Sequence, residues 1–348
     1  MEIRKIDIHT ADDLEVIKKD WIRLESGKEM TIYQSYAWNR LLVESWSKDV
    51  KNRIFSRISI YCLYDGSEIR FLMPIMIEKC SIRNRWICKD RGIHILGDGT
   101  YTDYLNGIYD QCSQDDILQT LEAIRSDHIN MPMLFRSIKE ETFFSSVLGK
   151  IGRLEKTGVY VSVKRRNNAD TYRKSLSKNT RQNLRTAQNR MEKDGVVYEL
   201  KVMDRVEPDF IEKLKRMHTE RLRVKNWNDR SFLHRLSSLI RQHFRIMDDR
   251  LAFDSMKCIK DSVWVVVYLN GQIAGYLYGL KDRKTIHIMQ NCVNIKYKYY
   301  SPMFRGAYDF IVKTYEGTKT DEVDFTRGTE TYKYWLGGSE SKLNSYLL

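Results

Sequence analysis

Residues 262–280 read SVWVVVYLNGQIAGYLYGL, and this stretch decides the fold of the second half of the chain. Residues 262–269 are rich in β-branched and aromatic side chains, which favours a strand. Asn270 and Gly271 follow, and this dipeptide is typical of a two-residue hairpin turn. Residues 272–280 then predict the returning strand. We therefore expect an antiparallel hairpin at the centre of a mixed sheet.

Strands and helices are predicted on both sides of this hairpin. After it come a strand at 284–291, a helix at 304–315 and a strand at 322–325. Before it, the pattern predicts three helices, at 178–191, 208–223 and 230–244, and the first of them lies in a segment rich in basic residues, 164–190. Sheet strands mixed with helices indicate an α/β fold.

The first half of the chain has a similar order of elements. The predicted elements are a strand at 2–8, a helix capped by Thr10, a helix at 36–46, a hairpin at 57–78, a strand at 85–96, a helix at 115–129, a strand at 133–136 and a helix at 140–148. Each half thus runs helices, hairpin strands, a helix and a strand. We predict two similar domains, at 1–155 and 156–348, with a helical insertion at about 170–245 in the second.

The bulk composition narrows the class of protein. The chain has 348 residues, of which 42% are hydrophobic and 30% charged, as in a globular protein. Its net charge of +13 favours anionic partners such as CoA phosphates, nucleotides, nucleic acid or acidic lipid headgroups. The six cysteines lack C-x-x-C spacing, so we expect neither a zinc site nor a disulfide framework.

Nothing in the sequence has the pattern of a membrane span or a secretory signal. No stretch approaches the roughly 18–20 apolar residues that cross a bilayer. The first twelve residues alternate charged and apolar side chains and lack the apolar run of a signal peptide. We expect a cytoplasmic protein, and a peripheral contact with a membrane surface stays open.

The tail of the chain carries a family resemblance. Residues 323–335 read VDFTRGTETYKYW, which resembles the D-F-x-R-G-D-E-x-Y-K-Y-x-[WF] signature of CelD/BcsL-like acyltransferases. This family belongs to the GNAT superfamily, is associated with cellulose and exopolysaccharide biosynthesis, and is related to FemAB-type transferases. Weaker matches occur in the same order along nearly the whole chain, at 35–38, 96–104, 176–184 and 217–221.

The resemblance implies two tandem GNAT-like domains and a particular chemistry. A GNAT-type enzyme transfers an acyl group from a thioester to an amine or hydroxyl. The implied cosubstrate is acetyl-CoA or another acyl-CoA, with no metal. The implied acceptor is a sugar, nucleotide-sugar or lipid-linked precursor of a surface polysaccharide, and N-acetyl transfer is the expected reaction.

The donor is expected to bind where the helix after strand 284–291 begins. Proline suits the first turn of a helix, and the free N–H groups at that end bind phosphate. The candidate donor-binding residues are Tyr300, Ser301, Met303, Lys298 and Arg181. An ordinary capped helix explains the first four equally well.

Two further groups of residues are candidates for catalysis and for binding the acceptor. The catalytic candidates are Asp324, Glu330, His218 and Tyr332. The substrate-binding candidates are Asp103, Tyr104, Lys178, Arg221, Arg327 and Lys333. A carboxylate or a histidine can take a proton from the acceptor, and basic groups can bind an anion. A structural ion-pair network in the tail and a solvated basic helix face are the alternative interpretations.

Three functions remain open from the sequence. The first is acyl-CoA-dependent transfer. The second is a FemAB-like aminoacyltransferase in which the basic helix 178–191 contacts the phosphates of an aminoacyl-tRNA. The third is a binding module with the same fold and no catalysis. Met303 and Thr329 keep it open, because the family more often has glycine and aspartate at these positions.

Overall fold

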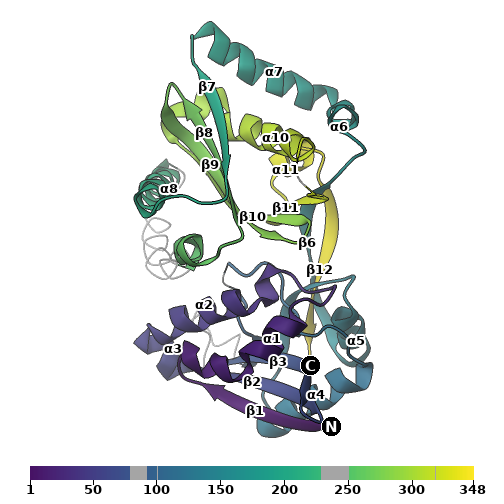
Figure 1. Cartoon of the computed structure of the whole chain (residues 1–348). Coiled ribbons are helices and arrows are strands. Elements are labelled where there is room, and N and C mark those ends of the chain that lie inside the picture. Colours follow the sequence, from purple (N-terminus) through teal and green to yellow (C-terminus); the bar gives the residue numbers. More distant parts are fainter. Residues whose placement is uncertain (79–91, 100, 229–250, 318) are drawn as a thin grey trace. The chain divides into compact units, whose positions relative to one another are not determined.

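The computed structural model describes residues 1–78, 92–99, 101–228, 251–317 and 319–348 (Figure 1). These residues divide into two compact units. Unit 1 comprises Met1–Gly158 with Lys342–Leu348, and unit 2 comprises Val159–Ser341. The sequence placed the boundary at 155/156, three residues earlier, and assigned the last residues to the second domain.

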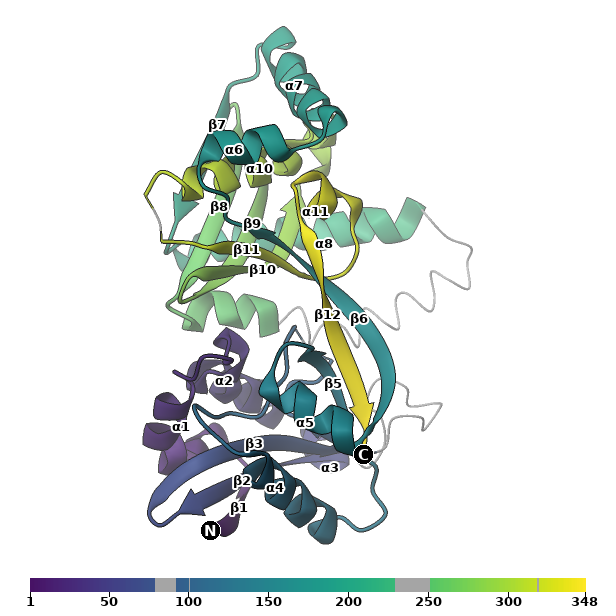
Figure 2. The same ribbon diagram turned by 90° about the vertical axis from the view of Figure 1, so that its right-hand side faces the viewer.

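The C-terminal residues belong to unit 1 because of strand pairing. Strand β12 (Ser339–Leu347) pairs antiparallel with β5 (Leu134–Lys139), from Leu343 opposite Lys139 to Leu347 opposite Leu134. On its other edge β12 neighbours β6 (Arg153–Lys164), as Figure 2 shows. Neither β12 nor the long course of β6 was predicted from the sequence.

Unit 1 contains a four-stranded antiparallel sheet with helices around it. Its strands, in spatial order, are β1 (Glu2–Ile8), β2 (Ser56–Asp65), β3 (Glu68–Glu78) and β4 (Gly92–Ile95). Its helices are η1 (Ala11–Ile17), α1 (Lys18–Leu24), η2 (Ile32–Gln34), α2 (Tyr36–Ser47), α3 (Val50–Phe55), α4 (Gln114–Asp127) and α5 (Phe143–Ile151). The predicted hairpin at 57–78 is confirmed. Of the predicted strand 85–96, residues 85–91 lie outside the described residues.

Unit 2 contains a mixed sheet in which all but one of the neighbouring pairs are antiparallel. The spatial order is β6, β11 (Glu322–Arg327), β10 (Thr285–Val293), β9 (Gln272–Asp282), β8 (Ser262–Leu269) and β7 (Tyr198–Met203). The exception is β10 with β11, which run parallel. Helices α8 (Pro208–Asn228) and α10 (Pro302–Thr314) cover opposite faces of this sheet (Figure 1).

The hairpin of residues 262–280 forms as predicted. Strand β8 pairs with β9 from Ser262 opposite Leu280 to Leu269 opposite Gln272. Asn270 and Gly271 form the turn with φ values of 49° and 74°. Positive φ at both positions is the type I′ geometry that matches the twist of the two strands.

The segment predicted as a helical insertion contains a strand. Helices α6 (Ala169–Ser175), α7 (Lys178–Lys193) and α8 lie within it, but Tyr198–Met203 forms the edge strand β7 and pairs with β8. The predicted helix at 230–244 lies outside the described residues.

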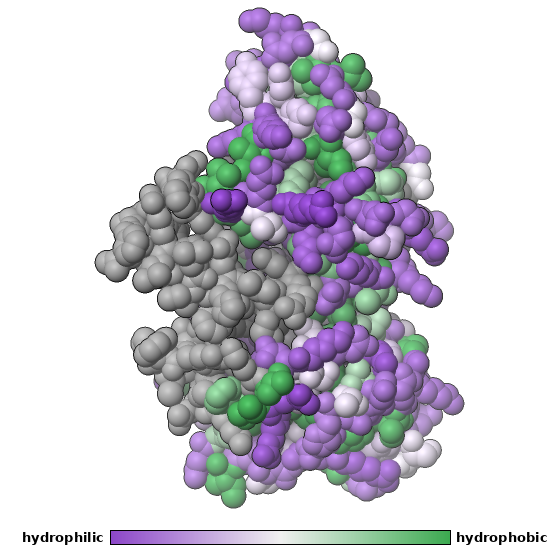
Figure 3. Space-filling view, turned by 90° about the vertical axis from the view of Figure 1, so that its left-hand side faces the viewer, coloured by the Kyte–Doolittle hydropathy of each residue, from purple (hydrophilic) through white to green (hydrophobic). Residues whose placement is uncertain are grey.

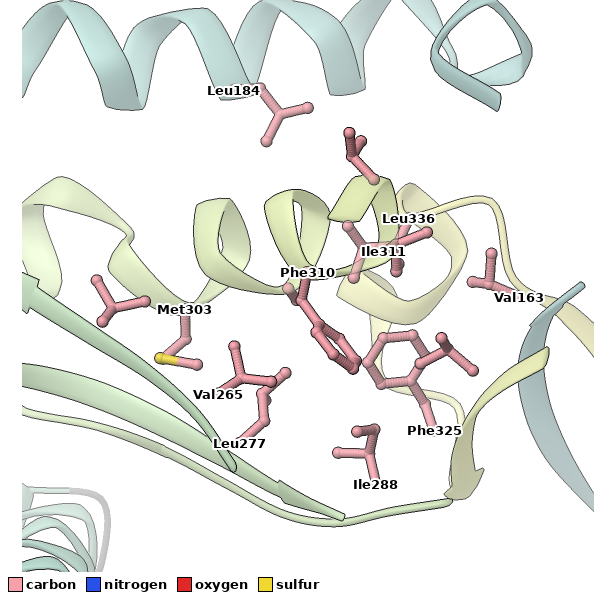
Figure 4. Packing of buried hydrophobic residues seen from close by; sticks show 14 of the residues in the cluster. Val163, Leu184, Val265, Leu277, Ile288, Met303, Phe310, Ile311, Phe325 and Leu336 are labelled. Carbon is pink, nitrogen blue, oxygen red and sulfur yellow. The ribbon is translucent and has the colours of Figure 1, made fainter. Parts of the chain in front are cut away.

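The core of unit 2 places α10 directly on the sheet. Met303 and Phe310 point from α10 toward the strands, and α7 covers the outer side of α10 with Leu184 (Figure 4). A Cβ at Gly306 would lie 2.4 Å from Val267, and one at Gly275 would lie 2.5 Å from Met303. Glycine at both positions therefore lets α10 approach the sheet closely and fixes where the helix begins.

The described surface carries mainly polar side chains. Figure 3 shows one side of the molecule, where hydrophilic residues predominate and apolar ones are scattered. In the ranges that the structure describes, no helix combines the length and the apolar character needed to cross a membrane.

Candidate active site

Strands β10 and β11 diverge, and this opens the sheet of unit 2. They pair only where Thr285, Ile286 and His287 lie opposite Glu322, Val323 and Asp324. Beyond that point, β10 continues to Val293 and pairs only with β9, with a bulge between Ile288 and Gln290. In open α/β sheets, ligands bind beyond the carboxyl ends of parallel strands, where neighbouring strands separate.

Four residues lie together at this open end: Arg221, Asn291, Glu330 and Tyr332. The Arg221 Nη1 atom of α8 donates a hydrogen bond to the carbonyl oxygen of Asn291 at 2.5 Å. Burial raises the pKa of Tyr332, a shift that the Asn291 side chain and the Arg221 charge oppose and the Glu330 carboxylate reinforces. The phenol is thus held protonated beside a cation and a carboxylate. Such an arrangement can supply a proton to a leaving group.

Tyr332 is positioned by helix α11 (Thr331–Trp335), which begins just after β11. Its ring packs edge-on against Phe325, with the ring centroids 5.8 Å apart. The sequence selected Tyr332, Glu330 and Arg221, and the structure brings these three together. Asn291 was missed, although two polar residues at the end of a predicted strand, Gln290 and Asn291, could have drawn attention to it.

Asp324 lies at the closed end of the divergence, where the two strands still pair. Its Oδ2 atom is 3.0 Å from Nδ1 of His287, and its Oδ1 atom accepts a hydrogen bond from the Thr326 N–H at 2.7 Å. The Asp324 side chain is fully buried. Its contacts are therefore with the protein itself, and it positions β10 against β11.

Lys333 is buried beneath the loop that joins β11 to α11. Its Nζ atom donates to the carbonyl oxygens of Thr326, Arg327 and Gly328 at 3.2, 2.8 and 3.2 Å. It also lies 2.9 Å from Oε2 of Glu330. Lys333 therefore holds this loop in shape, and Arg327 contributes its carbonyl oxygen to the same arrangement.

His218 lies three residues before Arg221 on α8 but has a different environment. It is buried, and its ring packs edge-on against Phe253 at a centroid distance of 5.9 Å. The structure places it against an apolar neighbour, whereas Arg221 reaches the open edge of β10.

The predicted donor-binding residues surround the start of α10. Ser301 adopts a left-handed conformation with φ of 50°, and Pro302 occupies the first turn. The first turn of α10 contains no acidic residue, and Lys298 is exposed on the preceding helix η3 (Ile295–Tyr300). Backbone N–H groups next to a lysine fit a phosphate group.

Two of these residues have structural contacts of their own. The Met303 side chain is buried against Gly275, so only its backbone N–H is available to a ligand. The Tyr300 hydroxyl donates to Oδ2 of Asp194 at 3.0 Å, and this hydrogen bond raises the pKa of Tyr300.

The remaining candidates lie elsewhere. Arg181 and Lys178 are exposed on α7, where Nη1 of Arg181 donates to the carbonyl oxygens of Lys174 and Leu176. Asp103 and Tyr104 are buried in unit 1, where Asp103 accepts a hydrogen bond from the Tyr33 hydroxyl at 3.0 Å. They form part of the packing of that unit, as Tyr104 stacks edge-on against Tyr33.

Comparison with known proteins agrees with this geometry. Residues 178–334 match the model of a family described as "Acetyltransferase (GNAT) domain". The matched segment spans α7 to α11 and so includes the divergence of β10 and β11. No curated protein matches the sequence.

Several solved structures share the fold at low sequence identity. FemX is 10% identical, covers 99% of this chain and 97% of its own, and has a TM-score of 0.58. A protein of unknown function from Bacteroides thetaiotaomicron is 13% identical, covers 99% of both chains, and has a TM-score of 0.54. The C-terminal domain of a putative lysylphosphatidylglycerol synthetase from Agrobacterium fabrum is 14% identical, covers 97% of this chain and 92% of its own, and has a TM-score of 0.53.

These likenesses, with the domain match, confirm the predicted fold class of two GNAT-like units with mixed sheets. The match to the GNAT acetyltransferase domain lies within unit 2.

Proposed function

We propose that the chain transfers an acyl group, in the simplest case acetyl, from acyl-CoA to an amine or hydroxyl of a surface-polysaccharide precursor. The acceptor is a sugar, carried by a nucleotide or a lipid, as in the CelD/BcsL-like proteins that residues 323–335 resemble. The observation that carries the proposal is the divergence of β10 and β11 with Tyr332 and Asn291 at its open end.

The donor is held at the start of α10. Its pyrophosphate accepts hydrogen bonds from the backbone N–H groups of the first turn, from Met303 onward, aided by the charge of Lys298. The thioester then reaches the gap between β10 and β11. The glycine contacts that fix α10 against the sheet keep these two ends of the donor site at a constant spacing.

Acyl transfer needs one proton removed and one supplied. The acceptor nitrogen or oxygen attacks the thioester carbonyl carbon and loses its proton to the Glu330 carboxylate, which is largely exposed. The C–S bond breaks, and the departing thiolate takes the proton of the Tyr332 hydroxyl. Holding donor and acceptor together supplies much of the remaining rate enhancement.

A second function is favoured by the charge of α6 and α7. Arg173, Lys174, Lys178, Arg181 and Arg185 are all exposed there. Such a surface suits the phosphates of a nucleic acid, so an aminoacyl-tRNA is the alternative donor. A binding module with this fold and no catalytic activity is the third candidate function.

Ligand-dependent stability separates these functions. The melting temperature of the whole chain is measured with excess CoA, acetyl-CoA, longer acyl-CoAs and deacylated tRNA, because a ligand of the native state raises it. We expect a rise with an acyl-CoA that the double substitution Ser301→Ala with Lys298→Ala diminishes. A rise with tRNA alone would move the donor to aminoacyl-tRNA, and no rise with either would favour a module without catalysis.

A further inference from the structure

Arg221 is a cation without an anionic partner in the described part of the chain. It is half-buried, and its Nη1 atom donates to the carbonyl oxygen of Asn291. No carboxylate of the described residues lies within ion-pair distance of its guanidinium. The Cys292 thiol next to it stays neutral, because burial raises its pKa to about 11 against the opposing effect of Arg221. A partly buried guanidinium with unused donors favours the binding of an anion.

Gln290 supplies a second unused donor. Its side chain is 5% exposed, and its Oε1 atom accepts a hydrogen bond from the Tyr276 hydroxyl at 2.6 Å. Its Nε2 atom is buried and has no hydrogen-bond partner among the described residues. Buried polar atoms in folded proteins almost always have a partner, so this amide is available to donate to an acceptor atom from outside the chain.

The Gln290 amide and the Arg221 guanidinium lie on the same face of the sheet. Gln290 and Cys292 are two residues apart on β10, so their side chains project from one face about 7 Å apart. Gln290 and Cys292 lie opposite Tyr278 and Tyr276 on β9, and neither tyrosine belongs to the hydrophobic cluster that packs against α10. Arg221 reaches the Cys292 thiol from α8, which covers this face.

We propose that Arg221 and Gln290 bind a carboxylate of the acceptor, so that the acceptor is an amine or hydroxyl compound that carries a carboxylate. The inference rests on the proposed acyl transfer beside Tyr332 and names its acceptor class. The Gln290 Nε2 atom and the Arg221 guanidinium are hydrogen-bond donors, so they bind an acceptor group and not a cation or another donor. A planar guanidinium matches a carboxylate through two parallel hydrogen bonds, and the amide adds a third. An amino sugar with a uronic carboxylate, or an amino acid, fits this description.

The test uses acceptors matched except for the carboxylate. Glucosamine is compared with 2-amino-2-deoxyglucuronic acid, and alaninamide with alanine, in acyl transfer by the whole chain with the donor that stabilises it. We expect kcat/KM to be about 10- to 100-fold higher for the carboxylate of each pair, as charged hydrogen bonds of this kind provide. The melting temperature of the whole chain, measured with each acceptor and without the acyl donor, compares the binding of the two members of each pair without requiring turnover.

Variants assign the preference to the two residues. Arg221→Lys keeps the positive charge but removes the planar guanidinium. Gln290→Glu adds a carboxylate of the chain itself, which should pair with Arg221 in place of the acceptor carboxylate. Both should bring the ratio of the paired acceptors close to one, whatever happens to the absolute rate. Arg223→Gln, an exposed position on the same helix, should keep the ratio.

The outcomes separate the two proposals. If wild type transfers to both members of each pair equally, the carboxylate site is wrong while the acyl transfer stands. If no acceptor is acylated, acyl transfer fails, and the carboxylate site is then judged on binding alone. Equal stabilisation by both members of a pair would overturn it.

Discussion

Nδ1 of His287 lies 3.0 Å from Oδ2 of Asp324, and both side chains are almost completely buried where β10 and β11 last pair. The contact joins the two strands immediately before they diverge. It therefore sets the position at which the gap opens and, through the backbone, the positions of Asn291 and Tyr332 at its other end.

Asp324→Ala should destabilise unit 2 strongly. Removing one partner of a buried polar pair costs about 3–5 kcal/mol, because the other partner stays buried. The free energy of unfolding in urea measures this loss. Asp321→Ala is the matched control, since Asp321 pairs with Lys284 at 3.0 Å with the two side chains 56% and 63% exposed. It should cost under about 1 kcal/mol. Equal losses in the two variants would contradict a special role for the buried pair.

Lys333→Met should open the loop between β11 and α11. Three backbone carbonyls lose a charged donor, and we expect a loss of about 3–5 kcal/mol together with a fall in acyl transfer, because Tyr332 follows this loop. Lys333→Arg should not restore either property, since a planar fork cannot replace a compact ammonium among three carbonyls.

The control for Lys333 is Lys342→Met. Lys342 pairs with Glu140 at 3.2 Å on the surface of unit 1, with its side chain 59% exposed. Its loss should change the unfolding free energy by less than about 1 kcal/mol. A Lys333→Met protein as stable as this control would show that the carbonyls gain little from the ammonium.

Tyr332→Phe should lower kcat with little change in stability. The phenyl ring keeps its packing against Phe325, while the proton donor is lost, which for general acids costs about 10²- to 10⁴-fold. Tyr334→Phe is the control on the same helix, because the Tyr334 hydroxyl is bound to Glu340. Unchanged kcat in Tyr332→Phe would remove this residue from the mechanism.

The pH dependence of kcat gives a second test of Tyr332. Burial raises the pKa of this phenol, so its proton is retained above the ordinary tyrosine value of about 10. The fall in wild-type kcat that follows deprotonation of Tyr332 should therefore begin above about pH 10. A loss centred well below that value would show that another group limits the reaction.

Cysteine reactivity tests the packing of β10 against α8. Cys258 is exposed and should react with iodoacetamide in the native protein, whereas the buried Cys292 should react only on unfolding. The pH dependence of stability gives a separate test of the burial of Cys292. Burial raises the Cys292 pKa from 9.0 to about 11, so the native state favours the protonated thiol. The resulting stability is fully present below pH 9 and is lost as the pH rises toward 11. Cys292→Ala should lose less stability over this interval than wild type, and equal losses would argue against burial.

Local patterns in the sequence were sufficient for most helices and for the hairpins. Asn270 and Gly271 specify their own turn, and Thr10 with Asp13 forms the capping box that begins the first helical segment, as the acidic first turn suggested. These features depend on residues a few positions apart. The order of helices and hairpin strands in each half was then enough to predict two α/β units.

Pairings between distant segments could not be predicted in this way. Strand β7 shows alternation in Tyr198, Leu200 and Val202, but its partner β8 begins almost sixty residues later, and no turn between them signals the pairing. The same holds for His287, which meets Asp324 only because two parallel strands lie side by side. The tail motif identified Tyr332 and Glu330, whereas Asn291 and Gln290 depend on where β10 loses its neighbour.

The ammonium of Lys333 occupies the kind of site that a small metal cation fills in other proteins, a cage of backbone carbonyl oxygens. Here the cation is tethered to the chain and cannot dissociate. The loop that carries the residues next to the gap should therefore keep its geometry in buffers free of potassium or sodium, and chelators or changes of salt should leave it intact.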